Sequence, residues 1–284
     1  MPVRTRRPRV MRALAVGGAT VAVVLLVGGC GADAENDSEP EHRTFALPGK
    51  TLTIDSSDST IELVPARKGA EGVRVTRWFD GKTVLGGDPK VTWKMAGDRL
   101  TLRMKCSGVI ANCSARHRVE IPRGVAVSVE NKDGRITAGG FRDGLKVRTE
   151  DGSVDVKDSE GPLNLHSSDG AITVNGASGP VELRSSDGSI HADGLTSRRV
   201  AVDSRDGSVK LRLAAVPDRV EARSKDGAVD IAVPGKKDGA DITYDVRTES
   251  RDGAVDVSVP RDDESPHHVN VHSSDGSVSV HSAN

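Results

Sequence analysis

The sequence predicts an all-β protein, a parallel β-solenoid of about nine coils that is expected to be right-handed. Three observations predict this fold. A motif that reads Ser-x-Asp-Gly in most copies recurs along the chain. The apolar residues around each copy alternate at period two, which is the period of a β-strand. Glycine and aspartate also return too often for a long helix.

Eight copies align on their Asp-Gly pairs. Almost all of the residues are apolar at four positions of this alignment: six and four before the aspartate, and two and four after the glycine. Each copy therefore predicts two strands of about five residues and one coil, and coils stack at about 4.8 Å. The predicted corners are Asp133, Gly134, Asp151, Gly152, Asp169, Gly170, Asp187, Gly188, Asp206, Gly207, Asp226, Gly227, Asp252, Gly253, Asp275 and Gly276.

Residues 1–29 are interpreted as the signal peptide of an exported lipoprotein. Five arginines precede an apolar run, 13–27, which is shorter than the roughly 20 residues of a membrane span. The run ends in Val-Gly-Gly-Cys, which resembles a bacterial lipobox, so we expect Cys30 to carry lipid such as palmitate. An ordinary signal peptide is the alternative. Arg6 and Arg7 leave general secretory and twin-arginine export both open.

Residues 30–42 are acidic and lack apolar periodicity, which predicts a disordered tether. Residues 1–30 hold five of the 40 Lys and Arg and none of the 41 Asp and Glu, so the remainder carries a net charge of −6. The sequence shows no basic patch, and only 2% of its residues are aromatic. Both points argue against a nucleic-acid partner.

Residues 43–125 are predicted to form an irregular β region that covers the N-terminal edge of the stack. Residues 52–63 fit the repeat template as a degenerate copy, with Ser59 in place of the glycine. Alternating segments follow at 73–78, 91–95 and 99–104, separated by longer connections.

Residues 126–284 are predicted to form the regular solenoid, and its Asp-Gly corners are expected to be structural. Glycine would supply a positive φ, the aspartate would accept from nearby N–H groups, and the small polar residue two before it would bond the corner backbone. Stacked aspartates about 5 Å apart repel each other by roughly 0.8 kcal/mol in water. A calcium ladder is the alternative, but the Gly-Gly-x-Gly-x-Asp pattern of calcium-binding repeats is absent. We expect no metal and no cofactor.

Cys106 and Cys113 remain once Cys30 is assigned to lipid. Two cysteines in an exported domain usually pair, so a disulfide is expected between them. Zinc is the alternative, but only His117 lies close in sequence.

The sequence predicts no enzyme. The coils are close to minimal, so their loops cannot wall a catalytic cleft, and no nucleophile motif or phosphate loop occurs. The outward columns mix charges without an aromatic strip for sugar stacking. His267 and His268 are placed in a solvated polar turn.

With its lipobox, its acidic tether and its iterated Ser-Ser-Asp-Gly corners, the chain resembles the adhesin-like, or toastrack-like, β-solenoid lipoproteins of Gram-positive bacteria, a family of unknown function that is abundant in actinobacteria. The resemblance covers residues 43–284. It implies a lipid-anchored parallel β-helix on the extracytoplasmic face of the cell membrane, with a role in adhesion or envelope-stress sensing.

The expected function is a non-enzymatic envelope scaffold for adhesion, or for binding a wall polymer or an envelope protein. The alternatives are an envelope-stress accessory protein with a membrane partner and a wall-polysaccharide enzyme. The last copy ends four residues before the chain does, so we expect its coil to end the stack and to allow end-on self-association.

Overall fold

The computed structural model describes residues 33–34, 37–83, 86–109, 111–237 and 239–283, all within one compact unit, Gly31–Asn284. Every element that we number in these residues is a β-strand. The expected signal peptide and the lipidation site Cys30 lie outside the described residues. Within these residues, no helix has the length and apolar character needed to cross a bilayer.

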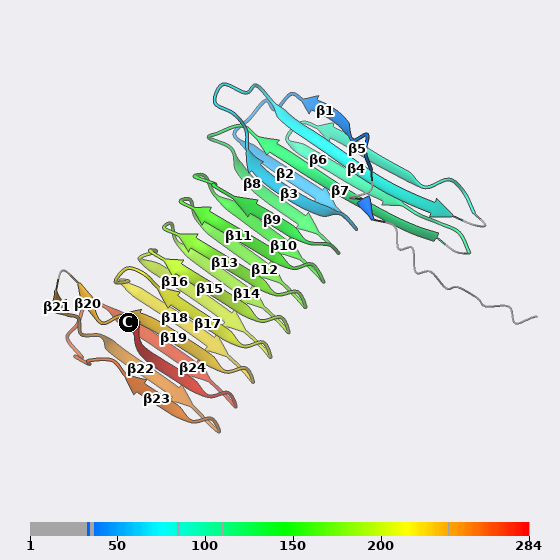
Figure 1. Ribbon diagram of the computed structural model, residues 1–284. Coiled ribbons are helices and arrows are strands. Elements are labelled where there is room, and N and C mark those ends of the chain that lie inside the picture. Colours follow the sequence, from blue (N-terminus) through cyan, green and yellow to red (C-terminus); the bar gives the residue numbers. More distant parts are fainter. Residues whose placement is uncertain (1–32, 35–36, 84–85, 110, 238, 284) are drawn as a thin grey trace, which may run out of the picture. The chain divides into compact units, whose positions relative to one another are not determined.

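Two large sheets form the fold, and each coil gives one strand to each sheet (Figure 1). Sheet B holds the first strand of each regular coil: β8 (Ala126–Asn131), β10 (Leu145–Thr149), β12 (Leu163–Ser167), β14 (Val181–Ser185), β16 (Arg199–Ser204), β18 (Arg219–Ser224), β22 (Asp245–Ser250) and β24 (His268–Ser273). Sheet A holds the second: β9 (Ile136–Gly139), β11 (Val154–Ser159), β13 (Ile172–Ala177), β15 (Ile190–Leu195), β17 (Val209–Leu213), β19 (Val229–Pro234), β23 (Val255–Ser258) and β25 (Val278–Ala283).

The strands of successive coils pair in parallel, in the register that the sequence columns predict. Leu145 on β10, for example, pairs with Val127 on one side and with Leu163 on the other. Residues of these columns are fully buried between the two sheets, as at Val147 and Leu165. The predicted fold class, an all-β parallel solenoid, is confirmed.

The degenerate copy is also a coil, and it lies between two others. Its strands, β2 (Thr51–Ser56) and β3 (Thr60–Pro65), pair in parallel with β8 and β9. On their other side they pair in parallel with β6 (Arg99–Lys105) and β7 (Ala111–Ile121). Residues 99–121 thus form a tenth coil in the described part of the chain, one that the repeat template did not predict.

Three antiparallel strands, here called the N-terminal cap, extend the sheets beyond this coil. They are β1 (Glu41–Phe45), β4 (Val73–Thr83) and β5 (Lys90–Ala96), and they pair β4 with β7, β5 with β6, and β1 with β4. Trp93 and Met95 of β5 pack against the core. β1 begins inside the segment expected as a tether, and the Asp37 carboxylate in that segment accepts a hydrogen bond from the Phe79 N–H at 3.0 Å.

The prediction that the last copy ends the stack is wrong. Strands β24 and β25 lie between the coil of β18 and β19 and the coil of β22 and β23. Both edges of the final copy are therefore paired, and the copy before it in sequence is the terminal coil. Val255 of that terminal coil is 44% exposed. A two-stranded hairpin, β20 (Lys236–Lys237) and β21 (Ala240–Asp241), precedes β22.

Candidate functional site

The predicted Asp-Gly corners stack in one column, but the glycines are needed for a different reason from the one predicted. Among the eight corner glycines, only Gly134 has a positive φ, of 98°. A Cβ on any of the other seven would lie 2.0–2.3 Å from the carbonyl oxygen of the corner glycine in the adjacent coil. At Gly188, for example, that oxygen belongs to Gly170 and lies 2.2 Å away. Close approach of stacked backbones therefore excludes a side chain.

The small polar residue of the motif bonds the corner backbone in seven of the eight copies, as predicted, and the buried Ser224 hydroxyl has no hydrogen-bond partner among the described residues. The Ser167 hydroxyl accepts from the Gly170 N–H at 3.0 Å and donates to the Gly152 carbonyl of the neighbouring coil at 3.0 Å. Ser250 makes the same two bonds, to Gly253 and Gly276. The hydroxyl thus fixes its own turn and joins it to the next coil.

Among the described residues, no corner aspartate accepts a hydrogen bond from a backbone N–H, and the carboxyls of neighbouring coils instead shift each other's pKa. Partial desolvation and hydrogen bonds with Asp151 and Asp58 raise the pKa of Asp133. A hydrogen bond with Asp226, then desolvation, raises the pKa of Asp206. The Lys225 ammonium, 3.1 Å from the Asp226 carboxylate, lowers the pKa of Asp226. The carboxyls of neighbouring coils therefore shift each other's pKa along the column. Across the described ranges, no group of three or more His, Cys, Asp or Glu is arranged to hold a metal.

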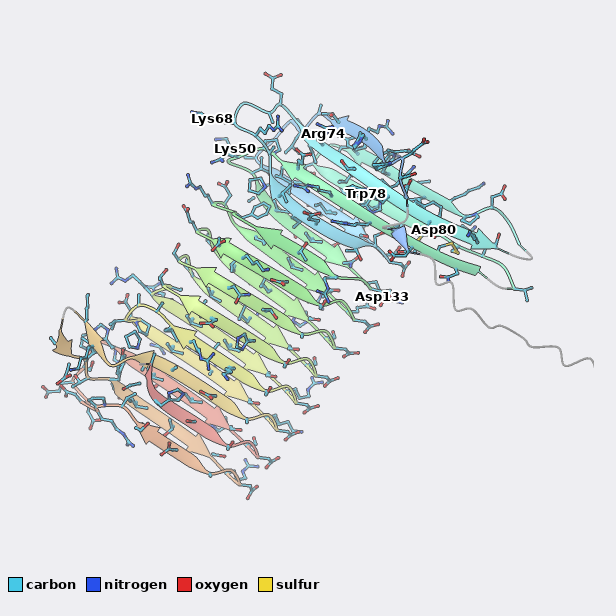
Figure 2. The ribbon with its side chains drawn as sticks, viewed as in Figure 1. Lys50, Lys68, Arg74, Trp78, Asp80 and Asp133 are labelled. Carbon is cyan, nitrogen blue, oxygen red and sulfur yellow. A yellow bond between two sulfur atoms is a disulfide. The ribbon has the colours of Figure 1, made fainter. Side chains whose placement is uncertain are left out.

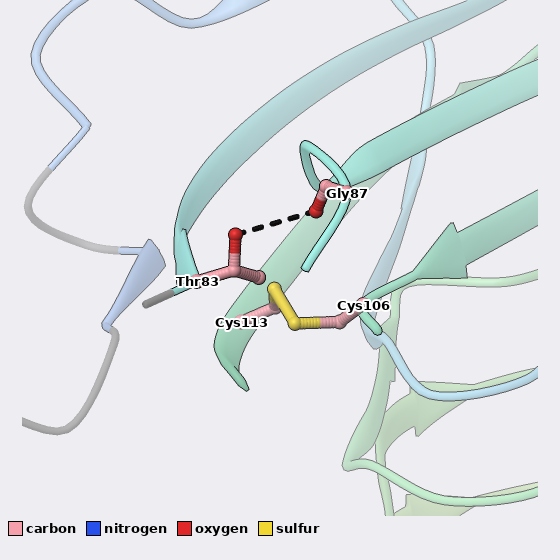
Figure 3. Close-up of a disulfide and its surroundings, with 4 residues drawn as sticks. All are labelled: Thr83, Gly87, Cys106 and Cys113. Atoms are coloured by element: carbon pink, nitrogen blue, oxygen red, sulfur yellow. Dashed lines mark hydrogen bonds between the residues drawn. A yellow bond between two sulfur atoms is a disulfide. The ribbon is translucent and has the colours of Figure 1, made fainter. Parts of the chain in front are cut away.

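The structure contains a disulfide between Cys106 and Cys113, with Cα atoms 6.2 Å apart (Figure 3). It spans the connection from β6 to β7, which is the corner of the tenth coil. Beside it, the Thr83 hydroxyl donates to the Gly87 carbonyl at 3.3 Å, within the connection from β4 to β5. The disulfide thus closes the corner where the N-terminal cap meets the solenoid.

Three adjoining hollows follow the outer face of sheet B and form the best candidate for a binding site. Their volumes are about 430, 390 and 450 Å³. Pro162 and Asn164 line both the first and the second, and Glu221 lines both the second and the third. The hollows thus run from β2, across the regular coils, to the terminal strand β22. We call this surface the sheet B groove.

The middle of the sheet B groove is an apolar floor between ion pairs. Pro180 and Ala201 line it together with two carboxylates, Glu182 and Glu221. The Asn164 amide donates to Glu182 at 2.6 Å, and Arg184 pairs with the same carboxylate. Arg219 donates to Glu221 at 2.7 Å. Both carboxylates are thus neutralised by neighbours on the same face.

Sequence reasoning did not find this groove, although a signal for it exists. Pro162 and Pro180 occupy the same template position in successive copies, immediately before the first strand. A proline at this position places its apolar ring on the outer face. Because it stands before the strand, its missing N–H does not remove a hydrogen-bond donor from the strand interior. The repeated position could have marked an outward apolar surface.

The histidine pair that was placed in a solvated turn is bonded instead. His268 is the first residue of β24, and its Nδ1 lies 3.0 Å from Asp245 Oδ2 on β22. This hydrogen bond is the main reason why the pKa of Asp245 is lowered. His267 Nδ1 lies 2.8 Å from the Pro217 carbonyl. Together the two side chains tie the final copy to both of its neighbours.

Among the comparisons with known proteins, a family model covers most of the chain. The family model described as Toastrack DUF4097 matches residues 49–284. No curated protein matches the chain. A solved structure of a "putative cell adhesion protein" from Clostridium sporogenes is similar at 9% identity, over 86% of this chain and 99% of that one, with a TM-score of 0.21.

Proposed function

The chain belongs to the Toastrack DUF4097 family, and from that premise we propose that it is a non-enzymatic lipoprotein of the cell envelope whose sheet B groove binds a wall polymer. The observation that carries the proposal is the continuity of the three hollows across many coils. A site that extends along a stack suits an extended ligand with repeating units, because each coil offers the ligand a similar set of contacts.

The chemistry of the groove favours binding over catalysis. Its paired carboxylates, Glu182 and Glu221, already accept hydrogen bonds from Asn164 and Arg219. A general acid or base needs a carboxyl whose proton is free to move to a substrate. Balanced ion pairs around an apolar floor instead suit sugar rings, which present apolar faces and hydroxyl edges.

One outward substitution tests the groove. Ala201 lies on its floor, so Ala201→Arg should fill the middle hollow without disturbing the buried columns. Thr173→Arg, on the outer face of sheet A, is the matched control. In pull-down with purified wall polymer, we expect Ala201→Arg to lose binding and the control to retain it. Equal binding of the polymer by both variants would reject the groove as the binding site. If the protein bound envelope protein and no polymer, the ligand of the groove would be an extended protein segment instead.

The location is proposed from the lipobox. Cys30 would carry the lipid and hold the solenoid on the extracytoplasmic face of the cell membrane. Cys30→Ser should then release the protein into the medium or leave it unprocessed, as judged by fractionation and by the mass of the product. A variant that stays membrane-bound with unchanged mass would reject the anchor.

A further inference from the structure

The charge of the chain is divided unevenly between its two ends. Residues 41–125 hold 15 Lys and Arg against 9 Asp and Glu, a net charge of +6. Residues 126–284 hold 20 against 28, a net charge of −8. Strands β1 to β7 therefore lie in a basic part of the chain, the segment 31–40 before them holds four Asp and Glu and no Lys or Arg, and the regular solenoid is acidic.

Strand pairing brings two of these cations together on the outer face of sheet B, and Lys82 on β4 of sheet A lies at the same end of the strands. Lys90 on β5 lies directly opposite Lys105 on β6, and both side chains are exposed. Opposite residues on antiparallel strands have Cβ atoms about 4.5–5.5 Å apart, so these two ammonium groups repel each other. Within the described part of the chain, neither lysine makes an ion pair. The pair of lysines is not visible in the sequence because the two residues are separated along the chain and meet only when β5 pairs with β6.

An exposed apolar side chain lies in the connection from β6 to β7, four residues after Lys105. Val109 is 78% exposed, and it belongs to the corner that the disulfide of Cys106 closes. In the same corner, Gly108 bridges to Gly86 in the connection from β4 to β5. We call Lys82, at the end of β4, together with Lys90, Lys105 and Val109, the basic tip.

The N-terminal segment joins the fold next to this tip. The Asp33 N–H donates to the Asp80 carboxylate at 3.3 Å, and the Phe79 N–H donates to Asp37 at 3.0 Å. Figure 2 labels Asp80 on β4, two residues before Lys82. Cys30 stands three positions before Asp33 in the sequence, with two residues between them, and three residues of chain span at most roughly 11 Å. In a lipid-anchored protein, this end of the fold is therefore the end that the chain joins to the anchor.

We propose that the basic tip rests directly on an anionic lipid surface. Val109 enters the headgroup layer, and Lys82, Lys90 and Lys105 face the lipid phosphates, which relieves the repulsion between the opposed lysines. The acidic solenoid is repelled from the same surface, so the contact orients the stack away from the membrane. The inference rests on the proposed lipoprotein function, because that function places a membrane next to this end of the chain.

Vesicle binding without any lipid anchor tests the contact. The compact unit Gly31–Asn284 contains every described strand, so it is used without residues 1–30. We expect it to sediment with phosphatidylcholine vesicles that contain phosphatidylglycerol, and not with phosphatidylcholine alone. Each lysine near an anionic surface strengthens binding by roughly fivefold, so Lys82→Glu/Lys90→Glu/Lys105→Glu should weaken it by on the order of 100-fold or more. Val109→Asp should also weaken it.

The control is Lys210→Glu/Lys236→Glu/Lys237→Glu, which makes the same change of charge in β17 and β20. It should bind vesicles nearly as well as the unaltered protein. Equal loss in both triple variants, or equal binding to neutral vesicles, would overturn the proposal. The proposal would also be overturned if the protein bound soluble polyglycerol phosphate as strongly as vesicles and Val109→Asp left that binding unchanged. This result would assign the tip to an anionic polymer. Lipidation of Cys30 is measured separately by mass, so failure of the anchor is distinguishable from failure of the tip.

Discussion

His117 on β7 lies directly opposite Arg77 on β4, at the end of the core that the N-terminal cap covers. The His117 imidazole is fully buried, and neither ring nitrogen has a hydrogen-bond partner among the residues that the structure describes. Burial, and then the charge of Arg77, lower the pKa of His117 from 6.5 to about 4. The Arg77 guanidinium crosses to sheet B, where it stacks 4.4 Å from the Trp93 ring centroid and donates to the Val91 carbonyl at 2.8 Å. The neutral His117 therefore lies next to the Arg77 cation, whose side chain joins the two sheets.

This arrangement predicts loss of stability in acid. Because the folded pKa of His117 is below its unfolded value, its contribution is present above pH 6.5 and is lost as the pH falls toward about 4. The total loss is on the order of 3 kcal/mol. His117→Leu places an apolar side chain in an apolar column and should remove this part of the pH dependence. Urea unfolding of both proteins at about pH 7 and about pH 4.5 measures it. If the free energy of unfolding fell by the same amount between the two pH values in both proteins, the assignment would be refuted.

The aspartate column predicts opposite effects for two neighbouring residues. The pKa of Asp206 is raised, so the folded state favours its protonated form, and that stabilisation is lost as the pH rises through the folded pKa. Asp206→Asn should therefore raise the melting temperature at neutral pH. The pKa of Asp226 is lowered by Lys225, so Asp226→Asn should lower the melting temperature. Melting-temperature shifts of the same sign would contradict the opposite pKa shifts of the two carboxyls.

The glycine column predicts a cost for the smallest side chain. Gly188→Ala would place a Cβ 2.2 Å from the Gly170 carbonyl oxygen, and a backbone atom cannot move aside cheaply. We expect a loss of on the order of 1–3 kcal/mol in the free energy of unfolding. Gly87→Ala is the control, because no atom lies within 4 Å of its Cβ position. Chemical denaturation that gives equal midpoints for both variants would show that the coils are not stacked this closely.

The order of the last two copies can be tested with valine truncations. Val278 of the final copy is 1% exposed, whereas Val255 of the preceding copy is 44% exposed. Val278→Ala should therefore cost roughly 2 kcal/mol and Val255→Ala less than about 1 kcal/mol. If the copies stacked in sequence order, the ranking of the two melting temperatures would be reversed.

The disulfide should stabilise the corner between β6 and β7. Cys106 and Cys113 are seven residues apart, and closing so short a loop is worth about 2 kcal/mol in the chain-entropy model. Cys106→Ser/Cys113→Ser should lower the unfolding midpoint accordingly. Reducing agent should shift the unaltered protein toward this value and leave the double variant unchanged. Two free thiols in protein taken from the envelope would refute the pairing in the cell.

The repeat made the regular coils predictable, because each copy carries the same columns and the same corner. The tenth coil lacks these signals: its corner has no Asp-Gly pair, and His117 stands where Ile61 and Ile136 stand in the two coils that follow. The stack order was hidden for the opposite reason. All copies present similar apolar faces, so nothing in Val269 alone shows that its neighbours are Val220 and Val246.

The groove and the basic tip were hidden for a further reason. Both depend on side chains that meet across neighbouring strands, such as Lys90 and Lys105, and a pattern along one strand does not reveal such pairs. The glycine corners were found for the wrong reason, because a sequence shows the absence of a Cβ but not the oxygen of Gly170 that excludes it at Gly188.

The inserted coils have a consequence for folding order. A nascent chain that stacked each copy as it emerged would place the coil 245–258 directly on the coil 219–234, and matching columns would make this misfolded pairing favourable. The native order is reached only when residues 268–283 come between them. At the other end, residues 51–65 must likewise be joined by coils on both sides, 99–121 and 126–139. Both ends of the solenoid are thus completed out of sequence order, so the slow steps of folding should lie at the ends and not in the middle.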